Sequence, residues 1–151
     1  MQDFEKAATP TIVPEQQLVI TSDVDRTLID FGRINYDLLE FLNDSKRAGH
    51  RVIITSTLSA VKIADSVDLI NDFSRMRGLD VLDSKEFELI SKNNLPSDLE
   101  IDYAFDDEPI TYANPAFEIR VNKDFSTTPL SLDALRSLCK LPKKENSQES
   151  A

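Results

Sequence analysis

The stretch LVITSDVDRTLIDF, residues 18–31, decides the fold predicted for this chain of 151 residues. It opens with an apolar and β-branched run, residues 18–21, which is typical of a buried strand in an α/β sheet. Asp23 and Asp25 follow just past the end of that strand. Two carboxylates in such a place repel each other and are poorly solvated unless a cation lies between them. Hard oxygen ligands on a small frame suit Mg²⁺, which often works on a phosphate group.

The same residues allow a simpler interpretation. The segment could be a polar turn between a strand and a helix, in which Asp25 or Ser22 caps the helix. The two interpretations make different demands on the rest of the chain. A shared cation requires further polar groups at the ends of neighbouring strands, whereas a cap requires only the helix that follows.

Composition and charge describe a single domain of ordinary make-up. Apolar residues make up 40% of the chain and charged residues 29%, which fits a globular protein with a buried core. The formal net charge of −10 argues against long nucleic acid or an anionic membrane surface as a partner. The single cysteine, Cys139, cannot form an internal disulfide, and neither a signal-peptide pattern nor a long apolar run is visible, so we expect a cytoplasmic protein. We expect a flexible leader over residues 1–17, one domain over 18–141 and a disordered tail over 142–151.

Helical and extended patterns alternate along the domain. Apolar residues at helical spacing over 36–48, with Asn35 as N-cap, separate the first strand from a second at 51–55. This order is a βαβ unit with a right-handed crossover. The remaining predicted elements are helices over 58–76, from Ser84 onward and over 132–141, and strands over 79–82, 101–105 and 116–121. The predicted fold is a three-layer α/β sandwich with a mainly parallel, Rossmann-like sheet.

Two other strands also end in polar residues. Thr55 and Ser56 close the second strand, where a hydroxyl could donate to a phosphate oxygen because α/β sheets bind ligands at these strand ends. They could equally cap the next helix. Asp106 and Asp107 close the strand at 101–105 and repeat the repulsion of the first acidic pair. The economical prediction is that both acidic pairs share one cation.

The order of these motifs resembles that of the haloacid dehalogenase-like superfamily, a large set of mostly Mg²⁺-dependent phosphohydrolases. The D-x-D-x-T of residues 23–27 resembles its first motif, GHRVIITS at 49–56 its second and YAFDDE at 103–108 its fourth. Its third motif is a lysine at a helix start that reaches the phosphate and the nucleophile. We favour Lys85 for this role, and Lys92 is its competitor.

The resemblance implies a role for each matching residue. Asp23 would be the nucleophile that forms an aspartyl-phosphate, and Asp25 the general acid and then the base. Thr27 would brace the turn. The implied phosphate-binding set is Ser56, Thr55, Lys85 and Thr27. The implied Mg²⁺ ligands are Asp23, the backbone carbonyl of Asp25, Asp106 and, directly or through water, Asp107.

The chain departs from the common pattern in two ways. Arg26 stands where many members have glycine, and residues 28–55 are too few to hold a cap domain. A capless site is open, which favours a large phosphorylated substrate, such as a protein or a nucleic-acid end, or a partner subunit that closes the site. The charge argues against long nucleic acid, and the substrate and oligomeric state are left open. The alternatives are a binding or regulatory module of this fold with weak turnover, and a phosphotransferase with the same residues.

Overall fold

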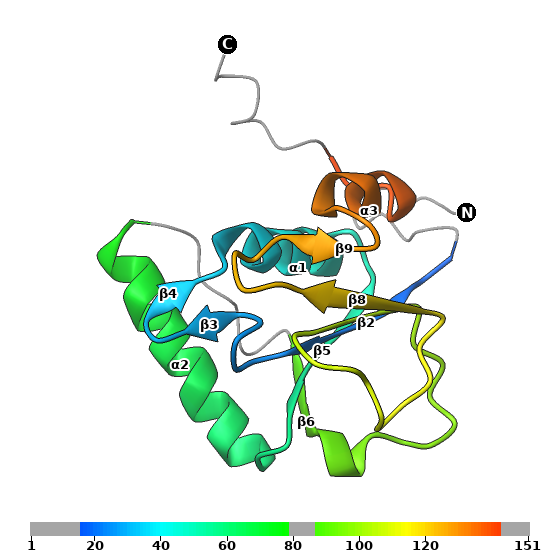
Figure 1. Ribbon diagram of the computed structural model, residues 1–151, viewed down its shortest axis with the longest axis horizontal. Coiled ribbons are helices and arrows are strands. Elements are labelled where there is room, and N and C mark those ends of the chain that lie inside the picture. The colour runs from blue at the N-terminus through cyan, green and yellow to red at the C-terminus, as the bar shows by residue number, and fades with distance from the viewer. Residues whose placement is uncertain (1–15, 79–86, 143–151) are drawn as a thin grey trace, which may run out of the picture.

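The computed structural model describes residues 16–78 and 87–142 (Figure 1). Its centre is a six-stranded sheet in the order β6-β5-β2-β7-β8-β9. Five strands run parallel and β9 is antiparallel to β8. The strands are β2 (Val19–Asp23), β5 (Arg51–Ser56), β6 (Glu88–Ser91), β7 (Tyr103–Asp106), β8 (Phe117–Val121) and β9 (Thr127–Thr128). The predicted α/β class with a mainly parallel sheet is therefore confirmed.

The α-helices of the described part pack into one core on one face of the sheet. They are α1 (Tyr36–Arg47), α2 (Ala60–Met76) and α3 (Leu132–Leu138). Residues from all three join a single cluster with one alternating set of strand residues, Ile20, Val52, Ile54, Phe105 and Ile119. Strand residues of the other set, such as Ile53 and Ala104, are buried outside this cluster. The segment after β7 crosses that second face, where the Ile110 N–H donates to Glu118.

The helix starts follow local capping chemistry. Asn35 caps α1 as predicted, since its side-chain oxygen accepts a hydrogen bond from the Leu38 N–H. Ser131 caps α3 in the same way, also as predicted. Helix α2 begins at Ala60, two residues later than predicted, because Ser59 is its N-cap. Helix α3 ends at Leu138 rather than at residue 141.

The segment over residues 88–91 corrects one prediction. The helix predicted from Ser84 onward is wrong over residues 88–91, which form β6 and pair with β5. The apolar spacing of so short a run fits either structure, and pairing decides between them. Arg51 holds the register, because its guanidinium donates to both Glu88 oxygens at 2.6 and 2.7 Å. A short 3₁₀ helix, η1 (Lys92–Asn94), follows.

Other predictions fall partly outside the described residues. The strand over 79–82 and the helix start at Ser84 and Lys85 lie there, as do most of the leader over 1–17 and of the tail over 142–151. A small antiparallel hairpin, β3 (Ile29–Asp30) and β4 (Arg33–Ile34), occupies the connection between β2 and α1. Of the helices in the described residues, none is long and apolar enough to cross a membrane.

Candidate active site at the strand ends

Three acidic side chains meet where β2 and β7 end. The parallel register pairs Ser22 with Phe105, so the next residues, Asp23 and Asp106, lie side by side. Both are buried, with 6% and 2% of their surface exposed. Asp107 joins them, and one carboxylate oxygen from each of the three lies within 4.8 Å of the others. The two acidic pairs found in the sequence are therefore brought to one point of the sheet.

A tight turn after β2 fixes Asp23. The Val24 carbonyl accepts hydrogen bonds from the backbone N–H groups of residues 27–29. This turn directs the Thr27 hydroxyl to Asp23 Oδ2 at 3.1 Å. Asn35 then anchors the turn, because its amide donates to the Thr27 carbonyl at 2.9 Å. The Thr27 hydroxyl thus holds one oxygen of the Asp23 carboxylate in place.

Arg26 lies at the most strained point of the same turn. Its φ of 63° is a left-handed conformation that glycine adopts more easily than other residues. Its exposed side chain reaches Asp107, with Nε 3.3 Å from Oδ2. Arg26 thus places a guanidinium against one of the three clustered acids.

Lys92 places its ammonium between two of the carboxylates. Its Nζ is 3.1 Å from Asp23 Oδ1 and 2.9 Å from Asp106 Oδ2, and only 12% of the side chain is exposed. It follows β6 directly and opens η1. The structure therefore brings Lys92, named as the competitor, into the site. Lys85, the favoured lysine, lies outside the described residues.

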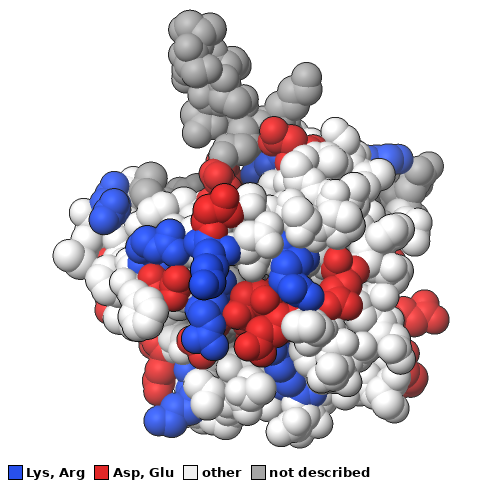
Figure 2. Space-filling view, viewed as in Figure 1, with Lys and Arg blue, Asp and Glu red and all other residues white. Residues whose placement is uncertain are grey.

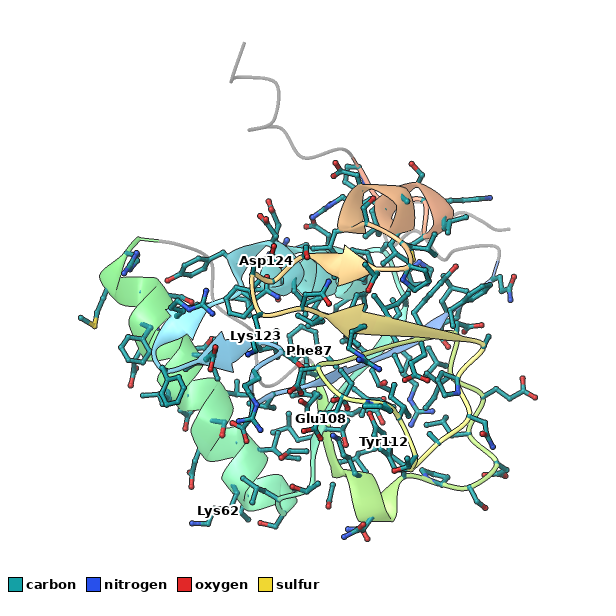
Figure 3. All side chains as sticks on the ribbon, in the orientation of Figure 1. Lys62, Phe87, Glu108, Tyr112, Lys123 and Asp124 are labelled. Atoms are coloured by element: carbon teal, nitrogen blue, oxygen red, sulfur yellow. The ribbon has the colours of Figure 1, made fainter. Side chains whose placement is uncertain are left out.

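Tyr112 completes the polar group around Asp106. Its hydroxyl donates to Asp106 Oδ2 at 2.9 Å, and the Lys92 ammonium lies 4.6 Å from the centre of its ring. Figure 3 labels Tyr112 in the loop that follows β7. No sequence pattern identified this residue, because it comes from an irregular loop and reaches the site only through the tertiary fold.

Burial and charge shift the protonation of this group. Burial, then the charge of Asp106, raises the pKa of Asp23 to about 7, against the opposing effect of Lys92. Burial alone would lower the pKa of Lys92, but its contacts with Asp106 and Asp23 outweigh that effect and raise it. Burial and the Asp106 charge raise the pKa of the Tyr112 hydroxyl. Lys92 therefore stays an ammonium at neutral pH, and Tyr112 stays a hydrogen-bond donor.

The other predicted residues lie around this centre in different ways. Asp25 is exposed, and its carboxylate is not part of the three-acid cluster. Ser56 is buried and its Oγ accepts from the Leu58 N–H at 3.1 Å, so its own hydrogen can donate elsewhere. The Thr55 hydroxyl instead donates to the Ile90 carbonyl of β6.

The donor set fits a hard divalent cation. Asp23, Asp106 and Asp107 offer carboxylate oxygens only, the ligand type that Mg²⁺ prefers. Their mutual repulsion is relieved by one ammonium and by hydrogen bonds from Thr27, Tyr112 and the Glu108 N–H. A bound divalent cation would reduce the repulsion between the three carboxylates further.

Comparisons with protein-family models, with curated proteins and with solved structures find no match to this chain. The function proposed below is therefore supported by the residues of this chain alone.

Proposed function

We propose that the protein is a Mg²⁺-dependent phosphohydrolase that works through an aspartyl-phosphate on Asp23. The observation that carries the proposal is the cluster of three carboxylates at the ends of β2 and β7, two of which contact one largely buried ammonium. A purely structural cluster would be more stable with fewer buried acids, because each one must be desolvated. The D-x-D-x-T motif and its likeness to the haloacid dehalogenase-like pattern support the same chemistry.

The first half of the reaction uses Asp23 and Asp25. An Asp23 oxygen attacks phosphorus, the bond from phosphorus to the leaving oxygen breaks, and Asp25 gives that oxygen a proton. Thr27 holds Asp23 Oδ2, which fixes the direction of the carboxylate. Lys92 contacts Asp23 Oδ1 and, with its positive charge, favours the ionised carboxylate that the attack requires.

The second half returns the enzyme to its starting state. A water molecule attacks phosphorus, Asp25 takes its proton, and the bond between phosphorus and Asp23 breaks to release inorganic phosphate. The exposure of Asp25 suits this role, since it must reach both the leaving group and water. Mg²⁺, when held by Asp23, Asp106 and Asp107, supplies positive charge that offsets the repulsion between an anionic nucleophile and an anionic phosphate.

The surroundings of the site support a large or partner-presented substrate. Between β2 and α1 the chain inserts only the β3–β4 hairpin, which pairs two residues with two. Figure 2 shows, on the face drawn in Figure 1, an acidic patch near the centre with basic side chains on both sides. A phosphorylated protein segment could lie across such a face, whereas a small phosphate ester would be little enclosed.

Hydrolysis of p-nitrophenyl phosphate with and without Mg²⁺ tests the proposal. We expect wild-type activity to require Mg²⁺, and Asp25→Asn to lower it by about 10²–10⁴-fold, the usual contribution of general acid–base catalysis. Asp23→Asn should abolish it, because the amide cannot form the intermediate. Asp72→Asn is the matched control, since Asp72 is an exposed acid on α2. Equal activity in Asp23→Asn and wild type would refute the proposal.

The contact between Arg26 and Asp107 favours a second candidate function. A guanidinium on a metal ligand weakens the ligand's hold on a cation, so the domain could serve as a phosphate-dependent binding module with weak turnover. In that case Mg²⁺ would still raise the melting temperature, but wild-type hydrolysis would stay at background and Arg26→Gly would increase it.

A further inference from the structure

An open depression lies beside the acidic site, on the face of the sheet away from the α-helices. Its volume is about 420 Å³. It is formed by alternate residues of β8 and its extension together with β9 and the residue after it: Glu118, Arg120, Asn122, Thr128 and Pro129. No residue of the proposed reaction lines it.

Arg120 is the residue of this depression whose side chain lacks a partner in the described part of the chain. Its Nε is buried and has no hydrogen-bond partner. Across residues 16–78 and 87–142, the guanidinium forms no ion pair. A buried, unsatisfied donor on a charged group is destabilising, so such groups normally have a partner. The planar fork of a guanidinium matches the oxygens of a carboxylate or a phosphate.

The position of Arg120 relates the depression to the proposed reaction. Arg120 pairs directly with Asp106 in the parallel register of β7 and β8. Paired residues point to the same face of a sheet, and neighbouring strands lie about 4.8 Å apart. The residues that carry the two groups are therefore neighbours on one face of the sheet, a separation that one small molecule can span.

We propose that Arg120 binds a second anionic group, a carboxylate or a phosphate, of the substrate whose reacting phosphate lies at Asp23. This inference rests on the proposed function for its assignment to a substrate. Glu118 also lines the depression and carries the opposite charge. One of its oxygens, Oε2, accepts the Ile110 N–H at 2.9 Å, which holds the carboxylate against the loop after β7. Glu118 thus weakens the attraction for an anion without neutralising Arg120.

Binding of three phosphonates to the full chain with Mg²⁺ tests the inference. Propylphosphonate carries one anionic group, whereas 3-phosphonopropionate adds a carboxylate and propane-1,3-bisphosphonate a second phosphonate. By calorimetry we expect at least one of the two longer ligands to bind wild type about tenfold more tightly than propylphosphonate, a difference of about 1.4 kcal/mol. Which of the two gains affinity distinguishes the carboxylate from the phosphate.

Substitutions test whether the gain in affinity of the longer ligands comes from Arg120. Arg120→Gln should remove the tenfold difference, and Glu118→Gln should increase it. Lys123→Gln is the matched control, because Lys123 is an exposed cation of the β8–β9 turn (Figure 3) and should leave the difference unchanged. The same ligand ratio in wild type and Arg120→Gln would overturn the inference.

A spectroscopic readout separates this inference from the proposed function. The Nε–H resonance of Arg120 in a ¹⁵N-labelled sample, assigned by its absence in Arg120→Gln, should shift with the longer ligands and not with propylphosphonate. If the Asp23 site does not bind phosphonate, affinity for propylphosphonate will not depend on Mg²⁺ or change in Asp23→Asn. The Arg120 shift is still decisive in that case: its presence supports the anion site, and its absence with all three ligands refutes it.

Discussion

Asp23 experiences two opposing influences that are both unusually strong. Burial and the neighbouring Asp106 carboxylate favour its neutral form, whereas Lys92 at 3.1 Å favours its charged form. The result is a carboxyl group that titrates near neutral pH rather than near its ordinary value of 3.8. A carboxyl group of this kind changes easily between its neutral acid and its anion near neutral pH.

The raised pKa predicts how the metal-free protein responds to pH. Because the folded state binds a proton that the unfolded chain has released, the contribution of Asp23 to stability is fully present below about pH 4 and is lost as pH rises through about 7. In EDTA, we expect the free energy of unfolding from urea titrations to decrease between about pH 4 and pH 7. Asp23→Asn should remove this part of the decrease. At the high-pH end of the range, its free energy of unfolding should exceed that of the wild type by about 1 kcal/mol or more.

Asp72→Asn serves as the control for that experiment, because Asp72 pairs on the surface with Arg75 and 70% of its side chain is exposed. Its pH profile should follow that of the wild type. A profile of Asp23→Asn that is parallel to the wild type would contradict the assignment of a raised pKa to Asp23.

At the scale of elements, Arg136 joins α3 to α1 through ion pairs with Asp44 and, at a longer distance, Glu40. Arg136 is 4% exposed, and its guanidinium donates to Asp44 at 2.9 Å and to the Pro142 carbonyl at 3.1 Å. Asp44 also pairs with Arg47 at 2.9 Å, but that side chain is 64% exposed. The same carboxylate therefore takes part in a buried and an exposed contact.

This arrangement predicts unequal effects for two alanine substitutions. Arg136→Ala should lower the free energy of unfolding by about 1–3 kcal/mol, because it removes the packing of a buried side chain and a charged donor to the part-buried Asp44 carboxylate. Arg47→Ala should change it by less than about 0.5 kcal/mol, as is usual for an exposed pair. Urea denaturation followed by circular dichroism measures both. Similar losses for the two variants would show that Asp44 stabilises the helix pair in some other way.

The elements also show what the sequence could and could not predict. Strand β2 and helix α1 were predictable because their apolar spacing and the Asn35 cap are local signals. Strand β6 was not, because its four residues fit two periodicities and only pairing with β5 decides. For the site, acids at strand ends formed a local pattern. Tyr112 and Arg120 had none, since their roles depend on which segments the fold brings together.

At the scale of the whole molecule, β2 lies in the interior of the sheet, between β5 and β7. Its pairing with β5 closes a short connection, in which the backbone N–H of Arg51 donates to the Leu18 carbonyl. Its pairing with β7 joins residues much farther apart in sequence, as in the hydrogen bond from Val19 to Asp102, which spans 83 residues. Asp23 and Asp106 belong to this second pairing. The site therefore exists only when two segments far apart in sequence have met.

This order of strands has a consequence for folding rates. Closing the longer loop costs more entropy, so we expect the folding transition state to be built from the shorter-range pairing of β2 with β5, and β7 to dock on β2 only afterwards. A cation bound by Asp23 and Asp106 would then stabilise the native state but not the transition state. We expect Mg²⁺ to slow unfolding in stopped-flow urea jumps by about the factor by which it increases the folding equilibrium constant, and to leave the refolding rate almost unchanged. Acceleration of refolding by Mg²⁺ would instead mean that the acids meet early, and that the site itself helps to nucleate the sheet.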